Sequence, residues 1–180
     1  DTLKYLGCDF SSFRRILDLG CGASRVLRWF VDTGPALYGT DISRDAIAWN
    51  KANVPGVTFS ANDPEPPTEY PDEYFDLIYA VSVVTHLNEQ LQLSWLKELN
   101  RLLRPNGLAV LTTMGERIAR TRLSESEMNR FREHGTIYKR IREGGLHGLP
   151  DFYQDAYHSR SYIEGVWSEH LAPRLFVAHG

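Results

Sequence analysis

The stretch from Ile16 to Arg25, which reads Ile-Leu-Asp-Leu-Gly-Cys-Gly-Ala-Ser-Arg, constrains the fold more than any other segment. The residues before Gly20 form an apolar run, typical of a buried parallel strand. Gly20 and Gly22 suit a tight turn whose backbone lies close to a ligand. A helix that follows such a turn presents unpaired N–H groups and the positive end of its dipole. The stretch therefore predicts a strand, a glycine loop and a helix start that bind a nucleotide-like ligand.

Further apolar runs alternate with helical patterns along the chain. Besides the strand that ends at Leu19, strands are predicted at 36–40, 57–60, 74–81 and 108–113, and helices at 24–33, 44–53 and 89–103. Ser43 and Asn88 are the expected N-caps of the last two helices. This alternation predicts an α/β fold, a doubly wound and mostly parallel sheet, and right-handed crossovers give the strand order 3-2-1-4-5. The glycine loop and residues 80–86 would then line one crevice at the carboxyl ends of the strands.

Composition narrows the class of protein. The 180 residues are 42% hydrophobic and 24% charged, which suits a single globular domain. A net charge of −3 argues against a protein that mainly binds nucleic acid. Cys8 and Cys21 are too few for a disulfide framework or a tetrahedral metal site, so we expect reduced thiols in a cytoplasmic protein and no metal. No apolar run in the sequence approaches the roughly 20 residues that span a membrane.

Polar residues follow the second and third predicted strands. Asp41 ends the second strand, where nucleotide-binding α/β folds place an acidic residue that accepts hydrogen bonds from ribose hydroxyls. The alternative role of Asp41 is a helix cap, but Ser43 is better placed for that. Asn62 and Asp63 follow the third strand, and a turn-forming pair before proline is an equally open interpretation of both.

In this order, the motifs resemble those of class I S-adenosylmethionine-dependent methyltransferases over nearly the whole chain. The motifs that carry the resemblance are Asp18–Gly22, Asp41–Ile42, Asn62–Asp63, Phe75–Ile78 and Leu99–Gly107. The run Ser82–Leu87 is similar to the Ser-Val-Phe-Thr-His-Leu sequence of a bacterial subgroup of generic methyltransferase domains. The chain departs from the family pattern at Ser24, which stands where the third glycine of the first motif is usual.

The resemblance implies S-adenosylmethionine as the cofactor and methyl transfer to a nucleophilic oxygen, nitrogen or carbon atom. We expect the acceptor to be a small molecule or a glycan-type hydroxyl. Asp18 would help to hold the methionine part, Ile42 would flank the adenine, and Asn62 or Asp63 would contact its amino group. The expected cofactor-binding residues are Asp18, Leu19, Gly20, Cys21, Gly22, Asp41, Ile42, Asn62, Asp63, Ala80 and Val81.

A hydroxyl acceptor needs a general base whose pKa lies near neutrality. His86, just past the fourth predicted strand, is the best-placed candidate, although a histidine there can equally orient a loop. Tyr157 and His158 are further candidates.

Two rival functions stay open. An NAD-dependent dehydrogenase needs Gly-x-Gly-x-x-Gly, but Arg25 stands three positions after Gly22 and opposes close packing of helix on strand. The other rival is a non-catalytic module that binds the cofactor and acts through a partner. The acidic and glycine residues of the first motif argue for cofactor binding, which both a methyltransferase and such a module require.

Residues 115–150 interrupt the alternation with interleaved basic and acidic side chains. Ser124 and Glu127 predict a capping box for a helix that ends near His134, and the glycines at 144–148 predict a mobile link. The segment is either a solvated helical excursion or a lid over the acceptor site that favours an anionic substrate. We expect one methyltransferase domain that carries this insertion.

The C-terminal part predicts an extended segment at 152–157, a helix at 161–170 and a strand at 173–178. The resembling family ends with an antiparallel sixth and seventh strand. If 173–178 is the sixth strand, the seventh lies beyond Gly180 and the chain is a fragment, which is the favoured interpretation. If 152–157 is one of the pair, the fold is nearly complete.

Overall fold

The computed structural model describes residues 3, 6–140 and 153–177. The chain divides into two compact units. The sheet unit comprises residues 1–81, 98–111 and 177–180, and the ladder unit comprises residues 82–97 and 112–176.

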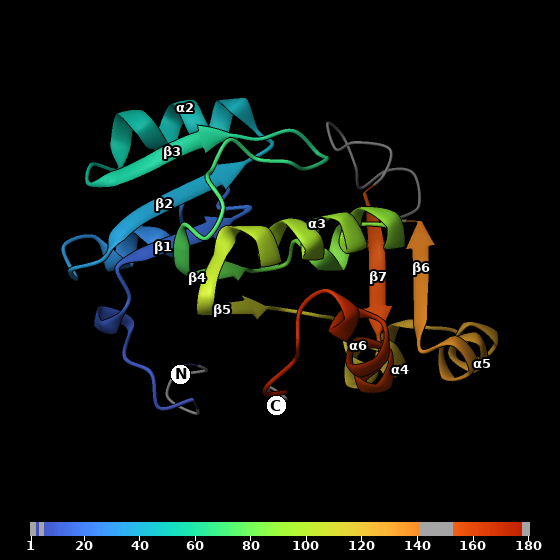
Figure 1. Ribbon diagram of the computed structural model, residues 1–180. Helices are drawn as coiled ribbons and strands as arrows, with labels where there is room; N and C mark the ends of the chain where they lie inside the picture. The colour runs from blue at the N-terminus through green and yellow to red at the C-terminus, as the bar shows by residue number, and fades with distance from the viewer. Residues whose placement is uncertain (1–2, 4–5, 141–152, 178–180) are drawn as a thin grey trace. The chain divides into compact units, whose positions relative to one another are not determined.

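Five parallel strands form the sheet unit, in the order β3-β2-β1-β4-β5 (Figure 1). They are β1 (Arg15–Leu19), β2 (Ala36–Asp41), β3 (Val57–Ala61), β4 (Phe75–Ala80) and β5 (Leu103–Leu111). Every residue of β4 is buried, as its apolar sequence requires of a central strand. The predicted fold class and strand order are confirmed. Because β1 pairs with both β2 and β4, Asp18 lies opposite Gly39 on one side and Tyr79 on the other.

Helix α2 (Arg44–Asn53) lies beside β3 and β2 in Figure 1 and contacts both strands. Its N-cap is Ser43, whose hydroxyl accepts a hydrogen bond from the Ala46 N–H, as predicted. The core on this side contains Ile16, Cys21, Leu27, Leu37, Ile47, Val54, Phe59, Leu77 and Tyr79. Helix α3 (Glu89–Leu102) begins after Asn88, whose side-chain oxygen accepts from the Leu91 N–H, which confirms the second predicted cap.

The ladder unit contains an antiparallel pair, β6 (Thr136–Arg140) and β7 (Gln154–His158), drawn side by side in Figure 1. Its helices include α4 (Glu116–Arg122), α5 (Glu125–His134) and α6 (Arg160–Gly165). Ser124 and Glu127 form the predicted capping box of α5. Gly135 ends α5 with φ of 73°, and a Cβ there would lie 2.8 Å from the Ser159 hydroxyl, so only glycine fits. Across the described part of both units, no helix has the length and apolarity needed to cross a bilayer.

The predictions for three segments were wrong in detail. The helix predicted at 24–33 is a turn followed by the short 3₁₀ helix η2 (Leu27–Phe30), because Ser24 has φ of 55° and breaks the helical path. The helix predicted at 161–170 divides into α6 and the 3₁₀ helix η4 (Trp167–Glu169). The strand predicted at 108–113 is part of the longer β5, which begins at Leu103 and ends at Leu111; the register moves from Phe75↔Leu103 to Leu77↔Leu108 and the extra residues bulge.

The predicted last strand was also wrong. Residues 173–177 adopt no strand, whereas 154–158 form β7 and pair with β6, a strand that helical patterning in the charged insertion did not predict. Both strands of this pair belong to a separate two-stranded sheet and do not extend the parallel one. The glycine-rich link predicted at 144–148 lies outside the described residues.

Candidate functional site

The glycine loop after β1 is anchored to the end of β2 by its own backbone. The N–H groups of Gly20 and Cys21 donate to the Thr40 carbonyl at 2.8 and 3.0 Å. The Gly22 N–H donates to Oδ2 of Asp41 at 2.7 Å, and the Gly22 carbonyl accepts from Nδ2 of Asn50 at 2.7 Å. Gly22 has φ of 49°, a conformation that favours glycine, and a Cβ there would meet open space. Open space therefore lies beside Gly22, although hydrogen bonds fix the backbone of the loop.

Two acidic residues, the buried Asp18 and the partly exposed Asp41, lie beside this loop. The side chain of Asp18 is 4% exposed, and burial raises its pKa to about 7, the Tyr79 hydroxyl lowers it, and the charge of Asp41 raises it further. The same surroundings raise the pKa of the Cys21 thiol to about 12, first through burial and then through the two carboxylates. Among the ion pairs of the described residues, none joins a lysine or arginine to Asp18 or Asp41. The site therefore fits a ligand that brings its own positive charge.

Asp41 keeps capacity for a ligand although the protein already contacts it. Oδ1 accepts from the Ser43 N–H at 2.8 Å and Oδ2 accepts from Gly22. Each carboxylate oxygen has a second lone pair, so ligand hydroxyls can still donate to this side chain. Ile42 next to it is 39% exposed, which leaves an apolar surface at the same edge. Leu19 and Ala80 are buried, whereas Val81 is 47% exposed.

A polar pocket of about 160 Å³ lies at the carboxyl ends of β2 and β3. It is lined by Thr40, Arg44, Ser60, Ala61, Asn62, Asp63, Pro67, Thr68 and Glu69. The Asn62 side chain accepts from the Thr40 hydroxyl at 2.9 Å and donates to the Asp63 carbonyl at 2.7 Å. The Asp63 carboxylate lies 3.8 Å from Arg44, and both side chains are largely exposed. Both predicted adenine contacts thus line one pocket.

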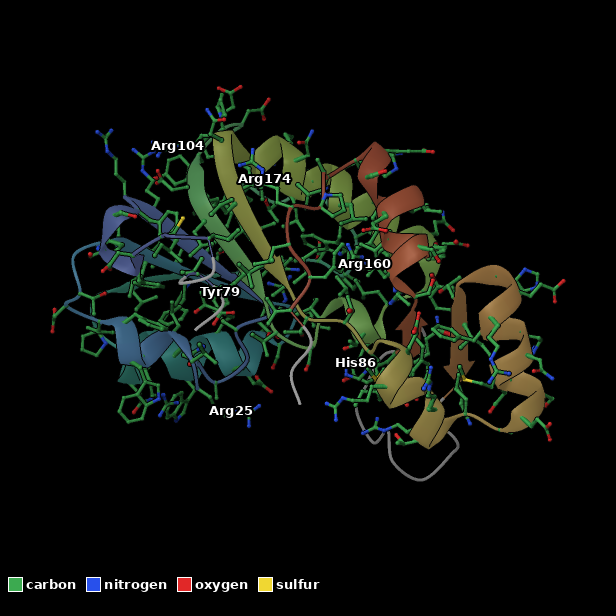
Figure 2. The ribbon with its side chains drawn as sticks, turned by 90° about the horizontal axis from the view of Figure 1, so that it is seen from below. Arg25, Tyr79, His86, Arg104, Arg160 and Arg174 are labelled. Atoms are coloured by element: carbon green, nitrogen blue, oxygen red, sulfur yellow. The ribbon has the colours of Figure 1, made fainter. Side chains whose placement is uncertain are left out.

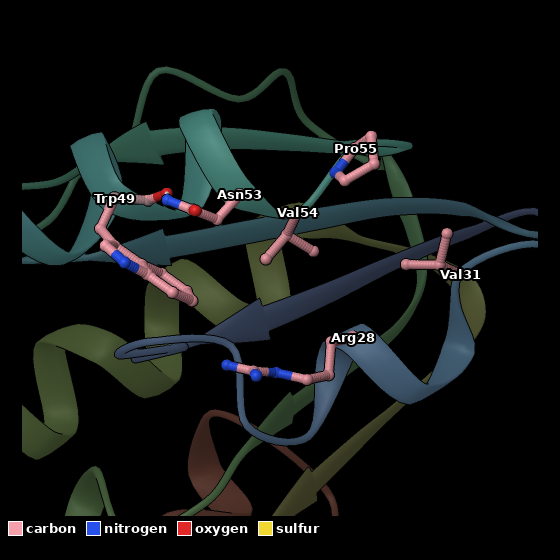
Figure 3. A pocket seen from close by; sticks show the side chains of 6 residues that line it. All are labelled: Arg28, Val31, Trp49, Asn53, Val54 and Pro55. Carbon is pink, nitrogen blue, oxygen red and sulfur yellow. The ribbon is translucent and has the colours of Figure 1, made fainter.

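A second hollow of the sheet unit, of about 270 Å³, lies between Arg28 and Trp49 (Figure 3). Val54 and Pro55 form part of its wall and precede the start of β3. The Arg28 guanidinium lies over the Trp49 ring at 5.6 Å from its centroid and donates to the Ser24 carbonyl. None of the predicted site residues lines this hollow, so the polar pocket is the better candidate.

The ladder unit contains His86, the candidate general base. It ends the 3₁₀ helix η3 (Val84–His86) and is labelled in Figure 2. Its Nδ1 lies 3.2 Å from the Gln154 carbonyl and 3.8 Å from the Asp155 carboxylate. A carbonyl can only accept, so Nδ1 carries the proton and Nε2 keeps a free lone pair. Burial lowers the pKa of His86, while the Gln154 carbonyl and Asp155 act in the opposite direction.

The other two base candidates are buried. His158 is 1% exposed, and its Nε2 lies 2.9 Å from Oε1 of Gln92. Because Nε2 of Gln92 already donates to the Val84 and Leu87 carbonyls, its Oε1 must accept and His158 must donate. Burial lowers the pKa of His158 to about 3. Tyr157 is 1% exposed and packs in an apolar cluster with Met128, Phe131 and Ile137. This burial weighs against a catalytic role for Tyr157 or His158. The catalytic role of each residue stays a prediction.

Three polar residues of the two sites escaped the sequence analysis. Asn50 and Gln92 lie three and four positions from the buried residues Ile47 and Leu96 on the same helix faces, so a polar residue in phase with apolar ones was an available signal. Asp155 has no such signal, because only folding brings it to His86.

A family model described as a methyltransferase domain matches residues 1–142. The chain is 30% identical over 110 residues to Methyltransferase GfsG of Streptomyces halstedii, covering 57% of this chain and 38% of that protein. It is 28% identical over 120 residues to a ubiquinone biosynthesis O-methyltransferase of Rhodopseudomonas palustris, covering 62% and 43%. It therefore spans less than half the length of these curated relatives. A solved S-adenosylmethionine-dependent methyltransferase from Mesorhizobium loti is 26% identical, with a TM-score of 0.53 over 63% of this chain and 52% of that one.

Proposed function

This chain belongs to the methyltransferase-domain family, whose cofactor is S-adenosylmethionine, and we propose that it transfers the cofactor's methyl group to a hydroxyl of a small molecule. The observation that carries the choice of a hydroxyl is His86, whose Nε2 keeps a free lone pair while its Nδ1 is held by the Gln154 carbonyl. A hydroxyl must lose a proton during methylation, and a neutral histidine is suited to accept it. The name of the relative from Rhodopseudomonas palustris, an O-methyltransferase, supports the same choice.

We assign cofactor binding to the sheet unit. S-adenosylmethionine supplies an electrophilic methyl group on a sulfonium when bound. Asp18 would hold the cationic methionine end, since its buried carboxylate has no cation partner among the described residues. Asp41 would accept from the ribose hydroxyls, and Ile42, Asn62 and Asp63 would surround the adenine. Leu19, Gly20, Cys21, Gly22, Ala80 and Val81 would supply the remaining lining of the crevice.

We assign proton removal to His86. When the cofactor is bound, His86 would accept the acceptor's hydroxyl proton at Nε2 while the methyl group is transferred to the hydroxyl oxygen. The imidazolium that results has Asp155 at 3.8 Å, and the negative charge of that carboxylate stabilises it. Asp155 is therefore a positioning residue for His86. Tyr153 stacks on the imidazole with ring centroids 4.1 Å apart, which restricts rotation of the ring.

The first test is calorimetric titration with S-adenosylhomocysteine and, in parallel, with NAD. We expect micromolar binding of the first, no binding of the second, and loss of binding in Asp41→Ala. Binding of NAD alone would replace the proposal with a dehydrogenase.

The second test follows transfer of a labelled methyl group to a panel of phenols, alkyl alcohols, sugars and amines. Label on hydroxyl oxygen is expected. Label found only on amines would overturn the proposed acceptor class. Binding of S-adenosylhomocysteine without methyl transfer to any member of the panel would favour the non-catalytic module.

A further inference from the structure

The segment between β3 and β4 forms one wall of the polar pocket through Pro67, Thr68 and Glu69. Four prolines interrupt it, at positions 64, 66, 67 and 71. Proline has no N–H group, so this loop has few backbone donors with which to hold itself against the sheet. The lining residues Thr40 and Asn62 are held differently, because Thr40 lies in β2, Asn62 directly follows β3, and their side chains bond to each other. The loop wall therefore depends on anchors from elsewhere in the sheet unit.

Glu98, on α3, is the first anchor. Its Oε1 accepts from both the N–H and the hydroxyl of Thr68, at 2.8 and 2.7 Å. The carboxylate is almost fully buried. Burial pushes the pKa of Glu98 upward, yet the hydrogen bonds from Arg101 and Thr68 hold it below its usual value. A buried charge that is satisfied in this way fixes the geometry of the groups that bond to it.

Arg101, one helical turn later, is the second anchor. Its guanidinium donates two parallel hydrogen bonds to the Glu98 carboxylate, from Nε to Oε2 at 2.8 Å and from Nη2 to Oε1 at 2.7 Å. Nη1 donates to the Tyr70 carbonyl at 3.0 Å and to Asp72 at 2.5 Å. The side chain thus joins the helix to both ends of the segment 68–72. A planar fork of five donors makes this possible, and lysine cannot reproduce it.

We propose that Glu98 and Arg101 are positioning residues of the cofactor site, which hold the loop wall of the polar pocket and thereby set the affinity for the adenosyl end of the cofactor. The proposal rests on the proposed function, because it takes the pocket at the ends of β2 and β3 as the adenosyl site. Neither side chain lines the pocket; both act through Thr68 and its neighbours.

The test compares Arg101→Met with Arg104→Met. Arg104, labelled in Figure 2, also pairs with a buried carboxylate, since its Nη2 lies 2.6 Å from Asp76, but it contacts β4 and not the loop. The two variants therefore lose the same chemical group and the same kind of partner. Dissociation constants are measured by calorimetry for S-adenosylhomocysteine and for adenosine, and thermal unfolding verifies that each variant is folded.

We expect Arg101→Met to weaken binding of both ligands about tenfold and Arg104→Met to change it less than about twofold. Equal losses for the two ligands locate the effect at the adenosyl end that they share. Glu98→Gln keeps an acceptor for Thr68, so a loss of about threefold is expected. In turnover, KM for S-adenosylmethionine should rise in Arg101→Met while kcat stays unchanged, which a general loss of folded protein would not produce.

Amide hydrogen exchange gives an independent readout. Exchange at residues 68–73 should become faster in Arg101→Met and remain unchanged in Arg104→Met. Unchanged exchange there would show that the pair does not hold the loop, and faster exchange with unaltered affinity would show that the loop does not set affinity. Either result overturns the inference while wild-type binding leaves the proposed function standing. Failure of the wild type to bind either ligand overturns the proposed function itself.

Discussion

One group of buried polar side chains in each unit illustrates two different ways of satisfying such groups. In the sheet unit, Asp18 is buried as an acid beside a second acid, Asp41, with no cation paired to either among the described residues. In the ladder unit, the buried side chains of Gln92 and His158 are neutral and bonded to each other. Gln92 satisfies both of its amide donors, and its oxygen accepts from His158 at 2.9 Å and from the Tyr138 hydroxyl at 3.3 Å.

The first arrangement suits the binding of a ligand, whereas the second stabilises the fold. A buried carboxylate without a cationic partner destabilises the folded protein, and burial raises the pKa of such a group. A cation brought by a ligand would stabilise the charged form. A hydrogen-bonded network of neutral groups instead rigidifies the fold. Within the ladder unit, His86 differs from His158 because its Nε2 is free and its side chain is 22% exposed. Of these two histidines, only His86 has a side chain that solvent reaches appreciably.

The largest expected effect tests the difference between His86 and His158. His86→Ala should lower kcat about 10³-fold without changing the affinity for S-adenosylhomocysteine, because general base catalysis is lost and the sheet unit is untouched. In the wild type, kcat should rise with pH through the lowered pKa of His86 and then level off, and the variant should lack this limb. His134 is the matched control, since it also lies 3.8 Å from a carboxylate but on the exposed end of α5. An equal loss in His134→Ala would remove His86 from the mechanism.

The next effect concerns the hydrogen-bonded network around Gln92. Gln92→Leu leaves two carbonyls, the His158 N–H and the Tyr138 hydroxyl without their partner. The free energy of unfolding should fall by about 3 kcal/mol, measured by urea denaturation. Gln90→Leu, on the exposed side of the same helix, should change it by less than about 0.5 kcal/mol. Similar values for the two variants would mean that the network contributes nothing to stability.

Acid sensitivity sharpens the contrast further. An unfolded histidine takes up a proton near pH 6.5, whereas folded His158 stays neutral down to about pH 3. As pH falls below 6.5 the unfolded state therefore binds more protons, and the folded state loses about 2 kcal/mol of stability by pH 5. Denaturation at several pH values should show this loss in the wild type and a smaller one in His158→Gln. The exposed control His134→Gln should behave as the wild type.

The smallest effect tests the acidic pair of the sheet unit. Asp18, with a pKa of about 7, must ionise to hold a cation. The affinity for S-adenosylhomocysteine should therefore fall about tenfold for each pH unit below 7, with proton release on binding. Calorimetry from pH 5.5 to 8 in two buffers measures both. Asp18→Asn should bind more weakly and show no such dependence, and a flat profile in the wild type would contradict the assignment. The titratable groups that face Asp18 are Asp41, Cys21 and Tyr79, and the expected pH dependence takes their effects on the pKa of Asp18 into account.

Much of the sheet unit was predictable. The apolar runs gave β1 to β4 to within one or two residues, since a strand buried on both faces must be apolar throughout. The caps Ser43, Asn88 and Ser124 followed from local chemistry. The helix after the glycine loop was mispredicted because the left-handed conformation of Ser24 depends on its buried surroundings. The strand β6 was hidden by charge patterning that also suits a helix.

By itself, the sequence determined the family of folds, the order of the parallel strands and the acidic residues at their carboxyl ends. These follow from the two periodicities of regular structure and from the few residues that accept a tight turn. Only the tertiary structure decided which histidine is buried and which is free, that Asp155 lies beside His86, and that Arg101 holds a loop about 30 positions before it in the chain. Such contacts join residues distant in sequence, and their geometry depends on how all the intervening segments pack together.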